Sequence, residues 1–234
     1  MGEHFEWLSF FLGHGVEAYS HVIVAAAILG VLFVSAVIVR ARYANASANL
    51  VPTSKGGIAT TFELAVEGIL NLMEGVMGPS ARRYLPLIGS LFIYIFVSNL
   101  IGMIPGMNPP TGNINTNLAC ALVVFVTYNV MGVREQGVKN YIKHFMGPII
   151  WLAPLMIVLE LVSHLVRPAS LSIRLFGNIM GDHMVLGVFT HLTKVGVPVI
   201  FLGLALFVSF IQAFVFSLLS MIYISLATSH EEHH

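Results

Sequence analysis

Charged side chains are scarce in this sequence. Asp, Glu, Lys and Arg make up only 9% of its 234 residues, whereas hydrophobic residues make up 57%. A water-soluble domain usually carries about a quarter charged residues. The shortage of charge therefore argues against an ordinary water-soluble fold. It predicts an all-α integral membrane protein, with one membrane domain over residues 1–234.

The sequence also has only one cysteine and no net charge. The single cysteine, Cys120, lies in an apolar run, so no internal disulfide exists and no redox role is suggested. Eleven basic residues balance eleven acidic ones, and a chain without excess positive charge is a poor nucleic-acid partner. The acidic N-terminal stretch lacks the basic start of a signal peptide, so we expect the first apolar segment to be retained.

Apolar runs predict about five membrane-embedded helices. The first is expected at about 21–39, and two more at about 84–104 and 118–133 form a helical hairpin over 84–133. Before the hairpin, residues 58–77 carry apolar side chains at helical spacing with glutamates opposite them. This pattern predicts an amphipathic helix that lies on the membrane surface.

The last two apolar stretches, about 149–189 and 195–227, exceed the thickness of a membrane. About 33 helical residues would measure ~50 Å against a ~30 Å hydrocarbon core. Each stretch must break into a hairpin or cross at a steep tilt. Neither holds the polar turn that a hairpin needs. We therefore expect two long, strongly tilted helices that pack side by side over residues 149–227.

Basic residues predict the orientation of the chain. With these spans, eight of the eleven Lys and Arg fall on one side, and the connection at 105–116 on the other side carries no charge. The eight are Arg40, Arg42, Lys55, Arg82, Arg83, Arg134, Lys139 and Lys143. The positive-inside rule places them in the cytoplasm, with the N-terminus outside and the C-terminus inside.

Polar residues form a row on the first of the two long helices. At offsets 0, 4, 7, 14, 18 and 22 they share roughly one helical face: Glu160, His164, Arg167, Arg174, Asn178 and Asp182. One interpretation is a buried ladder of ion pairs in which Glu160 and Arg167 neutralise each other. The topology places Glu160 nearer the cytoplasm, and Asp182 and the adjacent His183 nearer the outside. Ionisable groups at two depths suit two water-filled half-paths that do not meet.

Arg174 is the most informative residue of this row. A guanidinium at membrane depth costs from ~3 to more than ~10 kcal/mol. Its stem could snorkel to the headgroups. No carboxylate lies one turn away, however, since Asp182 is ~12 Å off along the axis. The sharper inference is a counter-charge from another polypeptide. Because Arg174 keeps its proton at physiological pH, we interpret it as an electrostatic gate between the half-paths.

Neighbouring residues could bring a second helix to this face. Residues 177–181 hold a small-xxx-small glycine pair, which suits either a foreign helix or ordinary packing within the chain. On the last helix, Ser209 and Gln212 interrupt an apolar run. Gln212 could hydrogen-bond across to Arg174 or Asn178, or to backbone carbonyls.

Three sequence motifs follow one another along the chain in a specific order and spacing. They are Ser98–Gly106 (SNLIGMIPG), Arg167–Asn178 (RPASLSIRLFGN) and Ile211–Ala227, which contains IQAFVF and IYISLA. Over roughly residues 58–230, their order and spacing resemble subunit a of the F-type ATP synthases, the stator half of the proton channel. The RLFGN run is highly specific.

The resemblance implies a role for each polar residue. Arg174 would face the rotor carboxylate of subunit c; Asn178, His183 and Gln212 would line the outer half-channel, and Glu160 would lead toward the cytoplasmic one. Protons would cross through these offset half-channels and drive rotary ATP synthesis. The expected ion path comprises Glu160, His164, Arg174, Asn178, Asp182, His183, Ser209 and Gln212. One position departs from the family pattern. The ionisable group usual seven residues before the Gln is Ala205 here, and Asp182 is our substitute.

The resemblance also implies partners and a location. The partners are a c-ring of small proteolipids, peripheral-stalk b subunits, the rest of the synthase and membrane lipids, in a bacterial plasma membrane. The sequence predicts no cofactor, metal or phosphate-binding glycine loop, so this subunit would be non-catalytic and nucleotide chemistry would occur elsewhere. The sequence selects neither H⁺ nor Na⁺ as the coupling ion, and it does not fix the ring stoichiometry.

Two competing interpretations are weaker. Residues 230–234 match the zinc-protease pattern H-E-x-x-H, but they occupy a terminus expected to fray, with no third ligand held nearby. A self-contained secondary transporter would be expected to show internal repeats and broken helices. No repeat is evident, and Arg174 requires an external partner.

Overall fold

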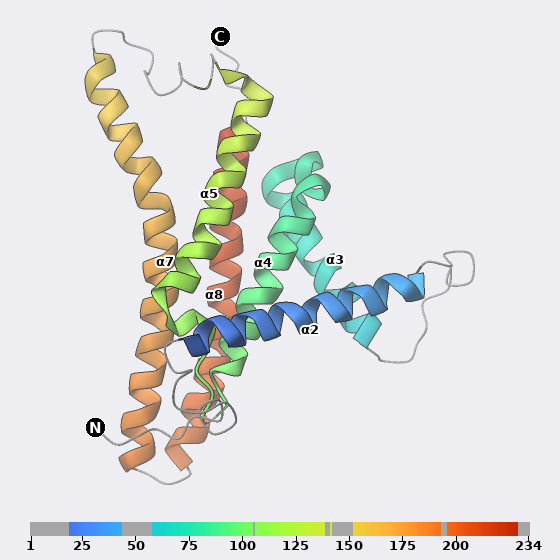
Figure 1. Cartoon of the computed structure of the whole chain (residues 1–234), viewed down its shortest axis with the longest axis vertical. Coiled ribbons are helices and arrows are strands. Elements are labelled where there is room, and N and C mark those ends of the chain that lie inside the picture. Colours follow the sequence, from blue (N-terminus) through green and yellow to red (C-terminus); the bar gives the residue numbers. More distant parts are fainter. Residues whose placement is uncertain are drawn as a thin grey trace. The chain divides into compact units, whose positions relative to one another are not determined.

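The computed structural model describes residues 19–43, 58–104, 106–138, 141, 152–192 and 196–228. The regular structure in these ranges is helical (Figure 1). The long helices are α2 (Ser20–Tyr43), α3 (Ile58–Met77), α4 (Ala81–Ile101), α5 (Ile114–Gln136), α7 (Ala153–Leu192) and α8 (Gly196–Thr228), and the short 3₁₀ turns are η3 (Gly78–Ser80) and η4 (Pro110–Gly112). The predicted all-α fold is confirmed.

Within the described residues, five helical segments are long and apolar enough to cross a membrane. They are Ser20–Ala41, Glu63–Ile101, Ile114–Gln136, Ala153–Thr190 and Pro198–Thr228. Their number agrees with the five membrane-embedded helices expected. The amphipathic helix has the bounds that the sequence predicted, 58–77. By length and composition, the second segment joins most of α3 to α4, so the position of α3 on the membrane surface stays a prediction.

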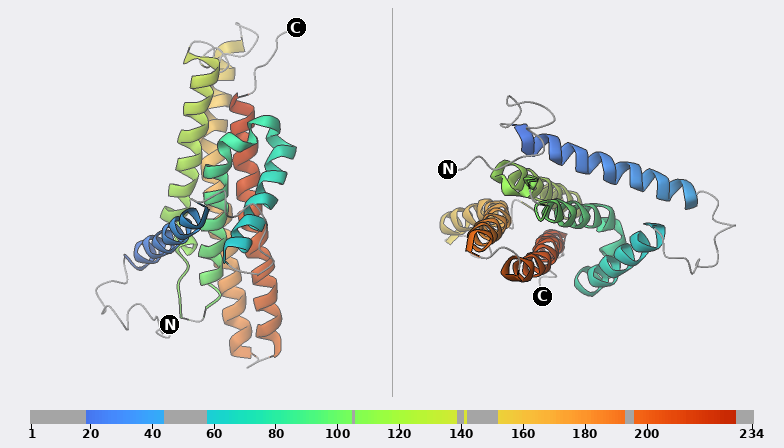
Figure 2. Two further views of the ribbon diagram at one scale, coloured as in Figure 1. Left: turned by 90° about the vertical axis from the view of Figure 1, so that its right-hand side faces the viewer. Right: turned by 90° about the horizontal axis from the view of Figure 1, so that it is seen from below.

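Contacts within the chain define two compact units, residues 1–110 and residues 111–234. In the first unit, α4 packs against both α2 and α3. Met73 of α3 and Ile88 of α4 are fully buried. In the second unit, α5, α7 and α8 contact one another, and their ribbons lie side by side in both views of Figure 2. The polar row lies on a helix of this second unit.

The core of the second unit is mainly apolar, although polar side chains such as Asn117 and Ser220 are also fully buried in it. Between His164 and Ile179 of α7, buried residues recur every three or four positions, which turns one stripe of the helix toward α5 and α8. The apolar core residues with an exposed fraction of 4% or less are Ala121, Val124 and Tyr128 of α5, Leu171, Leu175 and Ile179 of α7, and Ala213, Phe216, Met221 and Ile224 of α8. Beyond this core, the rings of Phe189 and Phe201 stack at 4.3 Å and join the far ends of α7 and α8.

Both long helices are continuous. The helices α7 and α8 have 40 and 33 residues, which correspond to ~60 Å and ~50 Å at 1.5 Å per residue. The hairpin alternative is therefore wrong for these two helices. Pro168 lies inside α7 without ending it, and its carbonyl accepts a hydrogen bond from the Ser172 hydroxyl at 2.8 Å. A strong tilt relative to the bilayer follows from these lengths and stays a prediction.

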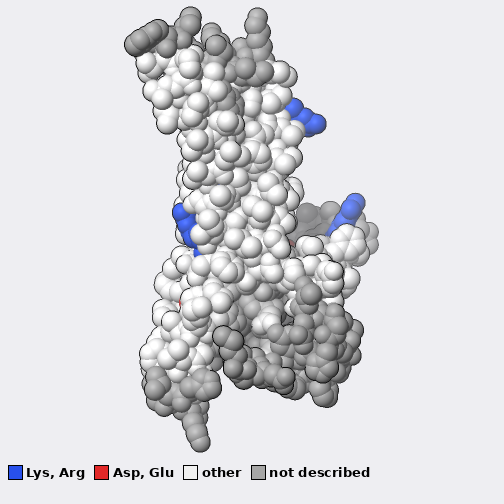
Figure 3. Space-filling view, turned by 60° about the vertical axis from the view of Figure 1, so that its left-hand side comes forward, with Lys and Arg blue, Asp and Glu red and all other residues white. Residues whose placement is uncertain are grey.

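The outward surface of α7 is mostly apolar. Leu155, Val158, Leu161, Leu165 and Ile173 are all more than half exposed. In the space-filling view, the few Lys and Arg side chains appear as separate blue spots on a largely uncharged surface (Figure 3). Such a surface suits contact with lipid tails or with another apolar protein.

Candidate functional site on α7

The structure divides the polar row of α7 into two groups. The inner group lies against α5 and α8 and consists of Glu160, His164 and Arg167. The second group lies further along the helix and consists of Arg174, Asn178, Asp182 and His183. Fourteen residues separate Glu160 from Arg174, which is ~21 Å along the axis, and eight more lead to Asp182, which is ~12 Å further.

Glu160 lies beside an imidazole and a guanidinium. Its Oε1 is 3.5 Å from Nδ1 of His164 and 3.6 Å from Nη2 of Arg167. The Glu160 and Arg167 side chains are only 30% and 25% exposed, so water screens this pair incompletely. The ion pair that the sequence spacing suggested is therefore present.

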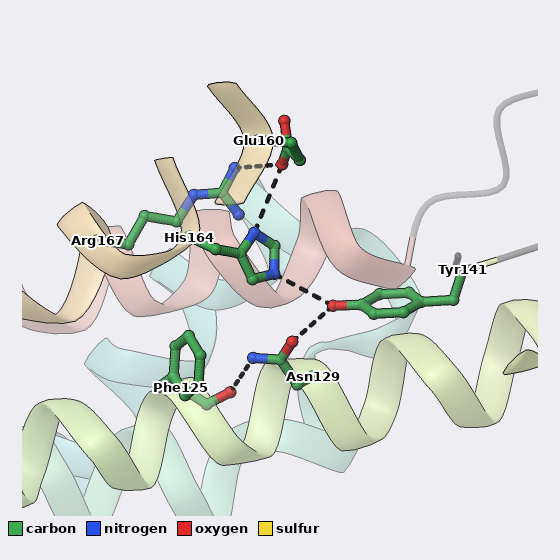
Figure 4. A network of polar contacts seen from close by, with 6 residues as sticks. All are labelled: Phe125, Asn129, Tyr141, Glu160, His164 and Arg167. Atoms are coloured by element: carbon green, nitrogen blue, oxygen red, sulfur yellow. Dashed lines mark hydrogen bonds and ion pairs between the residues drawn. The ribbon is translucent and has the colours of Figure 1, made fainter. Parts of the chain in front are cut away.

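A hydrogen-bonded chain connects this inner group to the end of α5. His164 Nε2 lies 3.2 Å from the Tyr141 hydroxyl, which donates to Asn129 Oδ1 at 2.7 Å. Asn129 Nδ2 in turn donates to the Phe125 carbonyl at 2.7 Å. Figure 4 shows these side chains in sequence, with His164 between Glu160 and Tyr141. A polar network thus links α7 to α5 inside an otherwise apolar bundle.

Arg167 also contacts two tyrosine rings from different helices. Its guanidinium carbon lies 6.0 Å from the ring centroid of Tyr128 on α5 and 5.5 Å from that of Tyr223 on α8. Each such contact contributes about 0.5–1 kcal/mol at a solvated site and more when desolvated. Arg167 therefore holds three helices together. Sequence reasoning missed both tyrosines, although aromatic residues with a polar tip inside apolar runs were a usable signal.

Arg174 has a different environment. Its side chain is exposed, and it has no hydrogen bond, ion pair or ring contact with any residue that the structure describes. A Cβ built on Gly177 or Gly181 would meet no atom within 4 Å. The described part of the chain therefore does not use the glycine pair for packing. The face around Arg174 is open.

Asn178 and Gln212 connect α7 to α8 next to this face. The Asn178 side-chain amide donates to Gln212 Oε1 at 2.5 Å. Gln212 is 3% exposed and Ser209, one turn before it, is 2% exposed. Of the hydrogen-bond partners that the sequence suggested for Gln212, the structure therefore shows Asn178.

Asp182 and His183 lie one turn further along α7, and both are partly buried. Asp182 Oδ2 is buried and has no hydrogen-bond partner among the described residues. On α8, the partly buried Ala205 provides no ionisable group. The second group of the row therefore combines a fixed cation, an amide pair and two titratable side chains. Residues 230–234, which match the zinc-protease pattern, lie outside the described residues.

Comparison with known proteins identifies relatives of this chain. A family model described as ATP synthase A chain matches residues 22–225. ATP synthase subunit a of Bdellovibrio bacteriovorus is 46% identical over 231 residues, covering 97% of this chain and 99% of the relative. ATP synthase subunit a of Trichlorobacter lovleyi is 50% identical over 180 residues, covering 76% and 78%. The same subunit of Geobacter sulfurreducens is 45% identical over 201 residues, covering 85% and 86%.

Proposed function

This chain belongs to the ATP synthase A chain family, and from that premise we propose how its residues translocate protons. As a component of the ATP synthase, it is the stator part of the proton path in the membrane. Two offset half-paths meet the rotor at the open face of α7. The rotor carries protons between them, and its rotation couples the gradient to ATP synthesis. Nucleotide chemistry belongs to other subunits, so this chain is non-catalytic.

The open position of Arg174 supports this proposal most directly. The chain provides Arg167 with a carboxylate and two rings but provides Arg174 with no described contact. An unpaired guanidinium at membrane depth is costly, so it requires a carboxylate from a partner. A carboxylate on each passing rotor subunit would meet that need. Arg174 would keep this carboxylate ionised as it passes and would repel cations that try to cross directly.

The two groups of the row then belong to separate half-paths. Glu160 and His164 lead to the cytoplasmic side, while Asn178, Asp182, His183, Ser209 and Gln212 lead to the outside. The ~21 Å between Glu160 and Arg174 separates the first path from the gate. On the outer side, Asp182 replaces the ionisable group that Ala205 lacks. In the orientation that the basic residues predict, the N-terminus lies outside and the C-terminus lies in the cytoplasm of a bacterial plasma membrane.

The rotor partner is a ring of small proteolipid c subunits. Gly177 and Gly181 leave space for a foreign helix to approach the α7 backbone closely beside Arg174. Peripheral-stalk b subunits would hold the stator still against the torque of this ring, and membrane lipids would cover the remaining apolar surface.

A cross-linking experiment tests this interface. Gly181→Cys places a thiol on the open face, where the added Cβ meets no atom of this chain within 4 Å. A cysteine series on the proteolipid should form disulfides with it in membranes. Leu165→Cys is the matched control, because Leu165 is 60% exposed but points away from the Arg174 face, nine residues back along the helix.

Two results would count against the proposal. One is equal cross-linking at positions 181 and 165. The other is saturable solute binding by the purified single chain, without any proteolipid, which would favour a self-contained transporter.

A further inference from the structure

The hydrogen bonds next to Glu160 run in one direction only. Asn129 Nδ2 donates to the Phe125 carbonyl, which turns Oδ1 of the amide toward Tyr141. An amide oxygen can only accept, so the Tyr141 hydroxyl donates its one proton to Asn129. The phenolic oxygen is then an acceptor for His164 Nε2 at 3.2 Å. His164 Nε2 must therefore carry a proton.

The direction of these hydrogen bonds determines whether a proton lies between His164 and Glu160. His164 Nδ1 lies 3.5 Å from Glu160 Oε1, an ion-pair distance at which the two atoms form no hydrogen bond. If Nε2 alone is protonated, a lone pair on Nδ1 faces a carboxylate, and neither atom can donate. One more proton makes the contact favourable, either on the imidazole or on the carboxylic acid. His164 is only 8% exposed, so little water is available to hydrogen-bond to the pair when it lacks the extra proton.

We propose that Glu160 and His164 form a site that shares one proton, and that Tyr141 is the positioning residue that keeps this site loaded. The inference rests on the proposed function, in which Glu160 leads to the cytoplasmic half-path. An empty pair takes a proton from hydronium, releases water and becomes an imidazolium facing a carboxylate. It then gives this proton to the half-path, where the rotor carboxylate accepts it, and returns to a neutral imidazole and a carboxylate.

The charged and titratable groups around Glu160 and His164 keep their protons, so the Glu160–His164 pair is the part of the cluster that changes charge. Arg167 lies 3.6 Å from Glu160 and stays a cation. The Tyr128 ring of α5 lies 5.4 Å from the imidazole, and Tyr223 of α8 faces Arg167 at 5.5 Å. Burial raises the pKa of Tyr141 above its ordinary value, so its hydroxyl keeps the proton that it donates. A Tyr141 that stays neutral also keeps its acceptor oxygen for His164.

Removing one oxygen atom tests the role of Tyr141. Tyr141→Phe leaves His164 Nε2 without this acceptor, so the imidazole can move its proton to Nδ1. A neutral imidazole can then donate to the carboxylate, and the pair no longer needs the extra proton. In the intact complex in inside-out vesicles, we expect the alkaline limb of ATP-driven proton pumping to move to lower external pH by about one unit, tenfold in proton concentration.

Tyr128→Phe is the matched control for this change. It removes the same atom from the same cluster, but the buried Tyr128 hydroxyl makes no hydrogen bond to His164 or Glu160, whereas the Tyr141 hydroxyl contacts His164 directly. Its alkaline limb should stay at the wild-type pH. Uncoupled ATP hydrolysis, measured at each pH in every variant, separates effects on the soluble catalytic part from effects on proton uptake.

A second variant tests the shared proton directly. His164→Gln removes the imidazole, so the pair loses the group that takes up the proton and becomes an imidazolium. The alkaline limb should therefore move further down than in Tyr141→Phe. Infrared difference spectra of the purified intact complex with ring-labelled histidine should lose an imidazolium signal in this variant. Tyr128→Phe should retain it.

The outcomes distinguish this inference from the proposed function. Wild-type alkaline limbs in both Tyr141→Phe and His164→Gln would overturn the shared site, even if Arg174→Gln stops pumping. Normal pumping in Arg174→Gln would overturn the proposed function itself. If His164→Gln does not assemble, the comparison of Tyr141→Phe with Tyr128→Phe decides.

Discussion

Replacing Arg174 with Gln should stop coupled ATP synthesis while leaving the chain folded and assembled. The side chain is exposed and has no described hydrogen bond, ion pair or ring contact, so the fold loses none of these. Removing a charge from membrane depth also avoids a cost of at least ~3 kcal/mol. Loss of the gate lets protons slip between the half-paths. We expect coupled synthesis below about 1% of wild type, equivalent to ~2.7 kcal/mol of lost discrimination.

Arg167→Gln, on the same helix, should reduce stability more than it reduces coupling. The variant loses the contact at 3.6 Å to Glu160 and the two ring contacts at 6.0 and 5.5 Å. Two cation–π contacts contribute about 0.5–1 kcal/mol each, and a partly screened ion pair up to about 1 kcal/mol. The second unit should therefore lose about 1–3 kcal/mol of stability. Coupling in the complexes that do assemble should fall far less than in Arg174→Gln.

Membrane vesicles allow both quantities to be measured on the same preparation. Coupled synthesis and ATP-driven pumping report function, while the amount of assembled complex and its thermal unfolding report stability. Arg174→Ala should behave like Arg174→Gln. Arg174→Lys should fail nearly as completely, because a desolvated ammonium can lose its proton and lacks the planar fork of the guanidinium. Near-normal synthesis in Arg174→Ala would refute the gate, and assembly as poor as in Arg167→Gln would refute the open environment of Arg174.

Two further predictions concern the half-paths. Cysteines beside Glu160 should react with thiol reagents added from the cytoplasm and those beside Asn178 with reagents added outside, over a low background from the buried Cys120; equal labelling from both sides would indicate one continuous pore. Asp182→Asn should slow passive proton conductance of the membrane sector stripped of its soluble part, and Ala205→Glu should restore part of it. Unchanged conductance in Asp182→Asn would make Asp182 a surface charge without a role in the path.

The helices were predictable because their signals are local. Apolar runs without polar turns indicate membrane helices, and the structure has continuous helices where the two longest runs occur. The polar row was visible because a helix repeats every 3.6 residues, so fixed offsets imply a common face. The same reasoning paired Glu160 with Arg167 correctly. It required no knowledge of the other helices.

The contacts between helices were not predictable from such patterns. Tyr141 follows the end of α5 and meets His164 23 residues later, and no periodicity relates positions on different helices. Asn129 stands in an apolar run, and its partner depends on how α5 faces α7. Gln212 had several reasonable partners by sequence, and only the packing of α8 against α7 brings it to Asn178. Long-range pairing is a property of the packed bundle.

The contrast between the two arginines supports the proposed partner of Arg174. Around Arg167 the bundle provides a carboxylate and two aromatic rings from three different helices, so the fold is able to satisfy a guanidinium in an apolar setting. Seven residues later, the same helix turns Arg174 outward beside two glycines whose added Cβ atoms would meet no atom within 4 Å. A chain that needed only to solvate this charge could have placed a carboxylate on α8. Under the proposed function, the open face makes Arg174 available to a carboxylate that arrives on another polypeptide and departs again.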